Sequence, residues 1–282
     1  MYQEPRYRSS VVYPGDPRRA RNTVRALAAH VNWEIVAGFV IVLGFLSYVL
    51  ATGNDVWRVP GTILLVLVGW IFSLCLHEFA HAATAFIAGD RSDTTATYLS
   101  FNPLKYLHPV LSILLPVVFI LLGGIGLPGG AVYLRRDLVR SRGWQSAISA
   151  AGPLMNVLVL VVIAIPFALG VFGDPFRSRS LLAEALGLLA FFQAAATVLN
   201  LLPIPGLDGY GIIEPWLPYS WRAALAPFRG YGILILFVLL WTLPQFNELY
   251  FSSVTNLMAA VRVDPVWFAR GYDTFNAIRP QL

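Results

Sequence analysis

His77, Glu78 and His81 form a His-Glu-x-x-His pattern within the stretch LCLHEFAHAAT that begins at Leu74. On a helix, positions i and i+4 share one face, so the two imidazoles can bind one metal ion from the same side. Zinc lowers the pKa of a water that it binds to about 7. Glu78 is then placed to take a proton from that water and later to give it to a leaving amine. The pattern predicts a zinc-dependent hydrolase.

The pattern lies near the end of a long apolar run. The sixteen residues before His77, 61–76, carry no charge. Ionisable side chains at membrane depth are costly, and they indicate a functional site by default. The alternative is a chance match to a short motif on an ordinary helix. We favour the functional interpretation because the motif follows a run of spanning character.

Composition indicates a membrane protein. The 282 residues are 57% hydrophobic and only 12% charged, whereas a soluble domain is about 25% charged. Several uncharged runs approach the roughly 20 residues that a spanning helix needs. The net charge of +5 comes from arginines that flank apolar runs, so we expect no nucleic-acid partner. The single cysteine, Cys75, excludes an internal disulfide and is expected to be a small buried apolar residue.

The predicted fold class is all-α, a polytopic helical membrane protein with about five to six transmembrane helices. Residues 1–32 are expected to form a disordered, basic, cytoplasmic tail, and 33–243 a transmembrane metalloprotease domain with its core at 60–214. Residues 244–282 are expected to form an interfacial or membrane-associated tail. The apolar runs that predict spans are 33–51, 60–89, 147–172, 181–202 and 227–243.

Asp208 is the candidate for a third metal ligand, which a catalytic zinc site requires. It follows Pro203 and Pro205, which must end the preceding helix. Irregular backbone at membrane depth is tolerated only where it is buried in protein or lines a cavity. The alternative is a turn residue before Gly209 at the membrane surface. Beside the His-Glu-x-x-His pattern, we favour the ligand.

The arginines predict the topology. Six of them precede the first span, which favours a cytoplasmic N-terminus. The span 60–89 then runs inward, and Asp208 reaches the depth of the histidines only if 181–202 also runs inward. Residues 109–134, rich in glycine and proline, must then re-enter the membrane on one side, which leaves the arginine cluster at 135–142 in the cytoplasm.

Three motifs resemble the site-2 protease family of intramembrane zinc metalloproteases. They are HEFAH at 77–81, AGPLMN at 151–156 and NLLPIPGLDG at 200–209. The pair Gly-Asp at 89–90 and FNPL at 101–104 resemble the compact bacterial subgroup that lacks PDZ and CBS domains. The motifs occur in the family's order.

This resemblance implies roles for six residues. His77, His81 and Asp208 would ligate one zinc ion per chain, with Glu78 as the base. Asn156 and Asn200 would line the site, where they bind substrate or stabilise developing charge. Two positions depart from the family pattern: Tyr210 replaces an expected glycine, and His108 lies where an acid is expected nearby.

The departures leave alternatives open. Tyr210 is expected to alter access to the site. His108 is either an interfacial loop histidine or a fourth metal contact, and we favour the former. His30 lies in the basic tail and receives no role.

The implied function is an intramembrane metalloendopeptidase that acts in regulated proteolysis in the bacterial inner membrane. Its partners would be the lipid bilayer and a transmembrane protein substrate, such as a membrane-anchored regulator; the oligomeric state is not predicted. A helical substrate must unwind locally, because its peptide groups are hydrogen-bonded within the helix. It would then pair, extended, with an edge near the site. Residues 94–101 and 129–134 are the candidate strand-like edges.

The main alternative is a transporter or ion-conducting protein that uses the His/Glu/Asp cluster as a cation or proton site. The sequence shows no repeated halves and no second buried ionisable cluster, which disfavours this alternative. An inactive scaffold that retains metal is disfavoured by the intact Glu78. A histidine-rich membrane oxygenase is disfavoured because the chain has only four histidines.

Overall fold

The computed structural model describes residues 17–53, 55–105, 139 and 141–276. Its regular elements are helices, and no strand occurs among these residues. Within the same residues, five helical stretches are long and apolar enough to cross a membrane. They are Trp33–Ala51, Asp55–Ile87, Arg142–Ala168, Leu181–Asn200 and Tyr219–Thr242. The all-α polytopic fold is therefore confirmed.

The first two long helices are α2 (Trp33–Ala51) and α3 (Arg58–Ile87). Asn32 caps α2, since its side chain accepts hydrogen bonds from two backbone N–H groups of the first turn. Most side chains of α2 are exposed although they are apolar. That pattern is typical of a helix that faces lipid on most of its surface.

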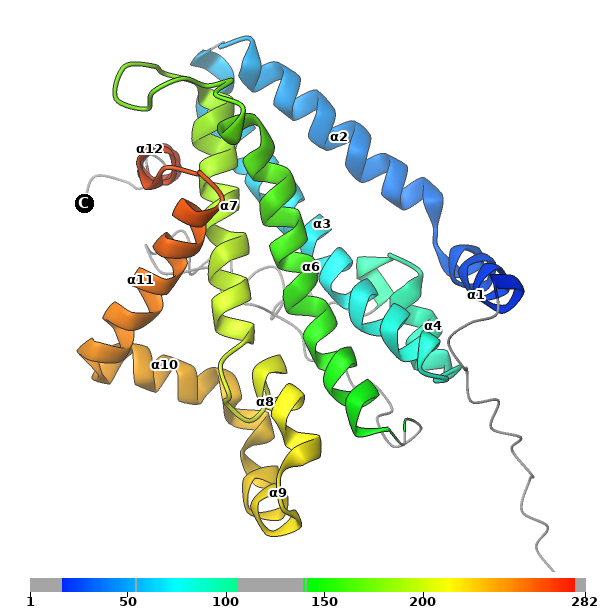
Figure 1. The fold of residues 1–282 in the computed structure, drawn as a ribbon. Helices are drawn as coiled ribbons and strands as arrows, with labels where there is room; N and C mark the ends of the chain where they lie inside the picture. The colour runs from blue at the N-terminus through cyan, green and yellow to red at the C-terminus, as the bar shows by residue number, and fades with distance from the viewer. Residues whose placement is uncertain (1–16, 54, 106–138, 140, 277–282) are drawn as a thin grey trace, which may run out of the picture.

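Three helices build the centre of the molecule: α3, α6 (Arg142–Ala168) and α7 (Leu181–Asn200). Figure 1 shows that α3 and α7 run in the same direction and that α6 runs in the opposite one. Consequently the end of α3, the beginning of α6 and the end of α7 lie at the same end of the bundle. α7 is the most buried of the five candidate spans.

The C-terminal segment packs against this centre. It contains α11 (Pro244–Ala260) and α12 (Pro265–Asn276), and both contact α7. The approach of α12 is close: a Cβ atom on Gly271 would lie 2.2 Å from the carbonyl oxygen of Glu184. Trp267 of α12 is almost fully buried.

Between α7 and α11 the chain forms short helices at one end of the bundle and then an apolar helix. These are α8 (Asp208–Ile213), η5 (Glu214–Trp216), α9 (Tyr219–Leu225), η6 (Ala226–Tyr231) and α10 (Gly232–Thr242).

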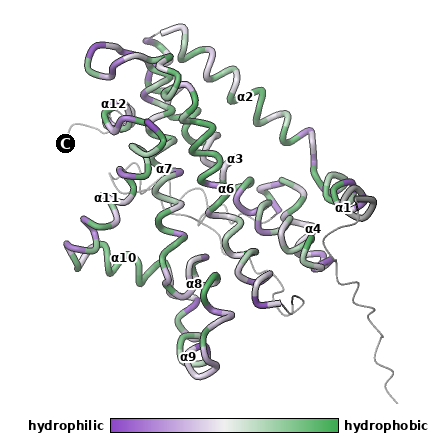
Figure 2. The backbone as a smooth tube through the Cα atoms, in the orientation of Figure 1, coloured by the Kyte–Doolittle hydropathy of each residue, from purple (hydrophilic) through white to green (hydrophobic). Residues whose placement is uncertain are grey.

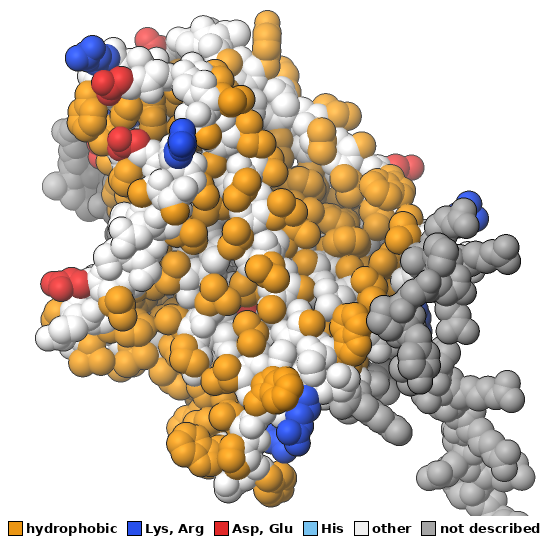
Figure 3. Space-filling view, in the orientation of Figure 1, with side chains coloured by type: hydrophobic (Ala, Val, Ile, Leu, Met, Phe, Trp, Pro, Cys, Tyr) orange, Lys and Arg blue, Asp and Glu red, His pale blue; other side chains and the backbone are white. Residues whose placement is uncertain are grey.

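Figure 2 shows that the long helices are mainly hydrophobic along their length. In Figure 3, hydrophobic side chains cover most of the visible face and few charged side chains lie near its middle. The surface suits a bilayer.

Several expectations differ from the structure. The residues 94–101, expected to be strand-like, lie mainly in a helix, α4 (Asp93–Leu99), which Ser92 caps. Part of the expected disordered tail forms α1 (Pro17–His30). A 3-10 turn, η1 (Asp55–Trp57), precedes α3, and another, η2 (Pro103–Lys105), follows α4. The expected re-entrant segment 109–134, including 129–134, lies outside the described residues.

Candidate metal centre

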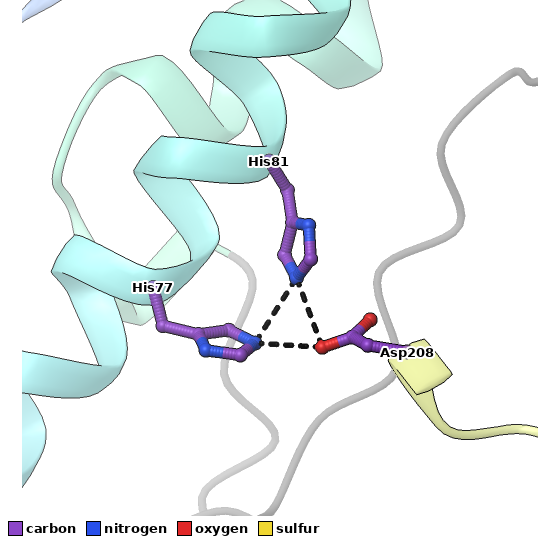
Figure 4. A group of neighbouring side chains, drawn as sticks. All are labelled: His77, His81 and Asp208. Atoms are coloured by element: carbon purple, nitrogen blue, oxygen red, sulfur yellow. Dashed lines mark hydrogen bonds and ion pairs between the residues drawn. The ribbon is translucent and has the colours of Figure 1, made fainter. Parts of the chain in front are cut away.

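Two helices that are distant in sequence bring three possible metal ligands together. His77 and His81 lie one turn apart on α3 and are buried, and Asp208 is the first residue of α8. Figure 4 shows the three side chains pointing toward a common centre. The Nε2 atoms of the histidines are 3.0 Å apart, and each lies 3.3 Å from Asp208 Oδ2. These atoms form the vertices of a compact triangle.

This triangle fits one zinc ion. Zinc bonds to imidazole nitrogen and carboxylate oxygen at about 2.0–2.2 Å, so ligand atoms of a tetrahedral site are about 3.3 Å apart. The observed separations of 3.0–3.3 Å match that value. Two imidazoles and one carboxylate also form a typical catalytic ligand set, which leaves a coordination position for a reactant.

Gly152 of α6 provides the space beside this triangle. A Cβ atom at this position would lie 2.2 Å from His81 Nε2 and 2.6 Å from His77 Nε2. These are the two nitrogen atoms that face the centre, so any larger residue would enter the space that the ligand atoms surround. Steric exclusion therefore explains why the Ala-Gly-Pro motif has a glycine at position 152.

Hydrogen bonds orient both histidines. His81 Nδ1 lies 2.6 Å from the carbonyl oxygen of Ile148, which can only accept, so Nδ1 carries the proton. His77 Nδ1 lies 2.5 Å from Asn156 Oδ1. In a neutral ring that carries its proton on Nδ1, the Nε2 atom is unprotonated, which is the form that binds a metal. Asn156 thus contacts a ligand histidine directly.

The path from α7 to α8 explains how Asp208 reaches the histidines. Pro203 and Pro205 prevent helix α7 from continuing, and Gly206 turns the chain with a φ of +99°. Gly209 then permits a close approach, since its Cβ would lie 2.2 Å from the carbonyl oxygen of Leu201.

The other side of α8 is attached to α6. Ser146 of α6 donates a hydrogen bond to the carbonyl oxygen of Ile212 at 2.6 Å and accepts one from Trp216 Nε1 at 2.9 Å. Asp208 therefore lies on a short helix that packs against the end of α7 and is hydrogen-bonded to α6.

Glu78 lies next to the first histidine and is only 3% exposed. Its Oε2 atom has no hydrogen-bond partner among the described residues. An unpaired carboxylate oxygen in a buried position is costly. Glu78 adjoins His77 in the sequence, and an oxygen without a partner among the described residues can accept a proton from a reactant.

Tyr98, from the capped helix α4, is close enough to Glu78 to interact with it electrostatically. Burial and, second, the charge of Glu78 raise the pKa of the Tyr98 hydroxyl above its ordinary value. The hydroxyl therefore remains protonated at neutral pH. The segment near Glu78 is therefore a helix, α4, where a strand was expected.

The remaining site candidates are placed as follows. Asn200 is the last residue of α7 and is partly buried, and no hydrogen bond between it and the three ligands is present in the described part of the chain. Tyr210 is buried in α8, two residues after Asp208. His30 lies on α1 and bonds to the carbonyl oxygen of Ala26. His108 lies outside the described residues.

Two polar residues near the site were not predicted from the sequence. Gln193 is completely buried in α7 and accepts a hydrogen bond from Asn156 at 3.0 Å. It also donates one to Ser73 of α3 at 2.8 Å. The signal was present, because an amide in the middle of an apolar span is as unusual as a charge there.

The chain is similar to several bacterial proteins named as zinc metalloproteases. "Putative zinc metalloprotease Rip2" of Mycolicibacterium smegmatis is 47% identical over 211 residues, which are 75% of this chain and 79% of the relative. The protein of the same name in Mycobacterium tuberculosis strain H37Rv is 40% identical over 218 residues, 77% of this chain and 82% of the relative. "Putative zinc metalloprotease YwhC" of Bacillus subtilis is 34% identical over 175 residues, 60% of this chain and 76% of the relative. No family model and no solved structure matches the chain.

Proposed function

Because this chain belongs to the site-2 protease family of zinc metalloproteases, we propose that it hydrolyses peptide bonds within or near transmembrane segments of other membrane proteins. The observation that carries the proposal is the position of the ligand triangle. Two of its vertices are on a candidate span, and the third follows another span directly. A substrate that reaches this site must approach through the bilayer or from its edge.

The depth of the site supports a substrate in the membrane. His77 is 19 residues from the start of α3, which is about 29 Å along the helix axis. That distance is close to the roughly 30 Å thickness of the hydrocarbon core. The site would therefore lie near one surface of the bilayer, where water reaches it from the adjacent aqueous side.

We assign the metal ligands as His77, His81 and Asp208. Zinc, when bound there, supplies Lewis-acid chemistry, which polarises a carbonyl group and acidifies water. The Nδ1 protons of the histidines are held by Asn156 and Ile148, which keeps both Nε2 atoms directed at the centre. The negative carboxylate of Asp208 reduces the net positive charge of the site.

Glu78 is the proposed general base. Its Oε2 atom has no partner in the part of the chain that the structure describes, so it can accept a proton from the attacking water and deliver that proton to the leaving amine. Glu78 is buried, and electrostatic interactions are stronger in such an environment than in bulk water. Asn200 is the candidate for contact with the substrate, because it lies at the end of α7 beside the turn that carries Asp208.

The proposed topology places the N-terminus in the cytoplasm of a bacterial cell and the protein in its inner membrane. The described helices agree with its relative arrangement, because the end of α3, the beginning of α6 and the end of α7 lie at one end of the bundle. That end would be cytoplasmic. A membrane-anchored regulator with a single span is the proposed class of substrate, and its cleavage would release a soluble domain.

The transporter alternative is not favoured. The separations between the three ligand atoms match those of a zinc site. In addition, relatives that align over most of their length are named as metalloproteases.

The test is cleavage of a model transmembrane substrate by purified protein in lipid vesicles. Wild-type protein should cleave, and Glu78→Gln should not, while both bind one zinc ion per chain. Glu184→Gln is the matched control, because Glu184 is a buried carboxylate in the first turn of α7, apart from the triangle. Cleavage by Glu78→Gln at the wild-type rate, or cation flux without cleavage by the wild type, would contradict the proposal.

A further inference from the structure

A chain of hydrogen bonds runs from a ligand histidine through two side-chain amides back to α3. His77 Nδ1 donates to Asn156 Oδ1 at 2.5 Å, and Asn156 Nδ2 donates to Gln193 Oε1 at 3.0 Å. Gln193 Nε2 donates to Ser73 Oγ at 2.8 Å, and Ser73 Oγ donates to the carbonyl oxygen of Trp70 at 2.9 Å. The chain connects all three central helices.

The direction of donation in this chain is set at its far end. The Ser73 hydroxyl donates its proton to the carbonyl oxygen of Trp70, and in this arrangement it offers its lone pairs to Gln193. Gln193 must then present its NH₂ group to Ser73 and its oxygen to Asn156. Asn156 in turn presents its NH₂ group to Gln193 and its oxygen to His77, which receives an acceptor.

Donation in the reverse direction along this chain would prevent His77 from binding a metal through Nε2. If both amides were rotated by 180°, the NH₂ group of Asn156 would face His77 Nδ1, and that nitrogen would have to be unprotonated. The imidazole proton would then be on Nε2, the atom that faces Asp208 and the metal position. A neutral ring in that form cannot bind a metal through Nε2.

The two ligand histidines therefore differ in what orients them. A backbone carbonyl, that of Ile148, holds His81, and it has no second orientation. An amide, which has two orientations of similar shape, holds His77. With Gln193 fixed, rotating Asn156 alone would set its oxygen against the oxygen of Gln193 at a buried position, since Gln193 is 0% exposed and Asn156 is 5% exposed. A polar atom left without a partner at such a position incurs the full desolvation penalty of that group.

We propose that Gln193, anchored by Ser73, is a positioning residue that fixes the orientation of Asn156 and thereby keeps Nε2 of His77 available to zinc. Neither Gln193 nor Ser73 is among the three residues that surround the metal position. The inference rests on the zinc site of the proposed function, but not on the nature of its substrate.

The first test is zinc affinity, measured by competition with a fluorescent chelator on purified wild-type and Gln193→Leu protein. Leucine fills a similar volume without hydrogen bonds. Loss of a residue that orients a ligand typically weakens metal binding 10- to 100-fold, and we expect about 10-fold. Thr197→Val is the matched control, because Thr197 is buried one turn further along α7 and, among the described residues, its hydroxyl bonds only to the backbone oxygen of Gln193. It should leave zinc affinity unchanged.

A rescue experiment separates positioning from packing. In Asn156→Asp both side-chain oxygens are acceptors, so the residue no longer needs to be oriented. The double variant Asn156→Asp/Gln193→Leu should therefore bind zinc within about threefold of the wild type, as expected of the strong carboxylate–histidine pair. If Gln193 served only to fill space, adding Asn156→Asp to Gln193→Leu would not restore the affinity, and that result would overturn the proposal.

A direct readout is the protonation site of the imidazole. With only four histidines in the chain, ¹⁵N-histidine spectra of the zinc-free protein can report the tautomer of His77 separately from that of His81. We expect Gln193→Leu, and also the milder Ser73→Ala, to give a mixed tautomer at His77 and no change at His81. Unchanged tautomers and unchanged zinc affinity in both variants would refute the inference. A protein that binds zinc as expected but cleaves no membrane substrate would instead refute only the proposed function.

Discussion

Gly152 lies so close to His81 that a Cβ atom on the glycine would be 2.2 Å from the histidine Nε2 atom. That nitrogen faces His77 and Asp208. The helix α6 therefore closes one side of the metal position with backbone alone.

Replacing Gly152 by alanine should abolish zinc binding. The added methyl group would push apart the nitrogen atoms that must converge within about 3.3 Å. We expect at least about a 100-fold loss of zinc affinity, with cleavage lost in proportion. Gly143→Ala in the same helix is the control, since the nearest atom to its added Cβ would be 3.8 Å away. Tight zinc binding by Gly152→Ala would show that the site lies elsewhere.

Removing the metal should lower stability as well as activity. The ligands come from α3 and from α8 beyond the end of α7, so zinc would link elements that are otherwise joined by packing. A ligand present at 100 times its dissociation constant stabilises the folded state by about 2.7 kcal/mol. Thermal unfolding in detergent, with and without a chelator, should show a lower midpoint for the metal-free protein, restored by added zinc. The Asp208→Ala variant should show no such difference, and an equal difference in that variant would argue against this site.

The proposed topology predicts which residues can be labelled from outside the cell. The helix α1 and the turn between α6 and α7 lie at opposite ends of the bundle. Asn22 of α1 and Arg177 of that turn are both exposed. In a Cys75→Ala background, a cysteine at position 177 should react with an impermeant thiol reagent in intact cells. A cysteine at position 22 should react only after the membrane is opened. The reversed pattern would invert the topology.

The sequence predicted the long elements well. The run 33–51 coincides with α2, and Leu181 begins both the predicted span and α7. These elements are long and uncharged, so their length and hydrophobicity determine them. Their proline and glycine neighbours also indicated correctly where α7 ends.

The short elements were predicted less well. The threonines and Tyr98 around 94–98 favour strands, but Ser92 caps a helix there and its Oγ accepts from the N–H of Thr95. Local capping overrides that preference. Residues 17–30 were assigned to a tail because of their charge, although they form α1.

The surroundings of the ligands were beyond prediction for a geometric reason. Which face of α7 meets α6 depends on packing between helices, so the bond between Gln193 and Asn156 cannot be derived from spacing along the chain. The same holds for Gly152, whose lack of a side chain has meaning only once α6 lies against α3.

The central claim is that a carboxylate after α7 completes a zinc site begun by two histidines on α3. It is tested most directly by the zinc content and affinity of Asp208→Ala beside Glu78→Gln, both purified by the same procedure. We predict one tightly bound zinc ion per chain in Glu78→Gln, and affinity reduced by at least about 100-fold in Asp208→Ala. Equal zinc content and affinity in the two variants would contradict the account.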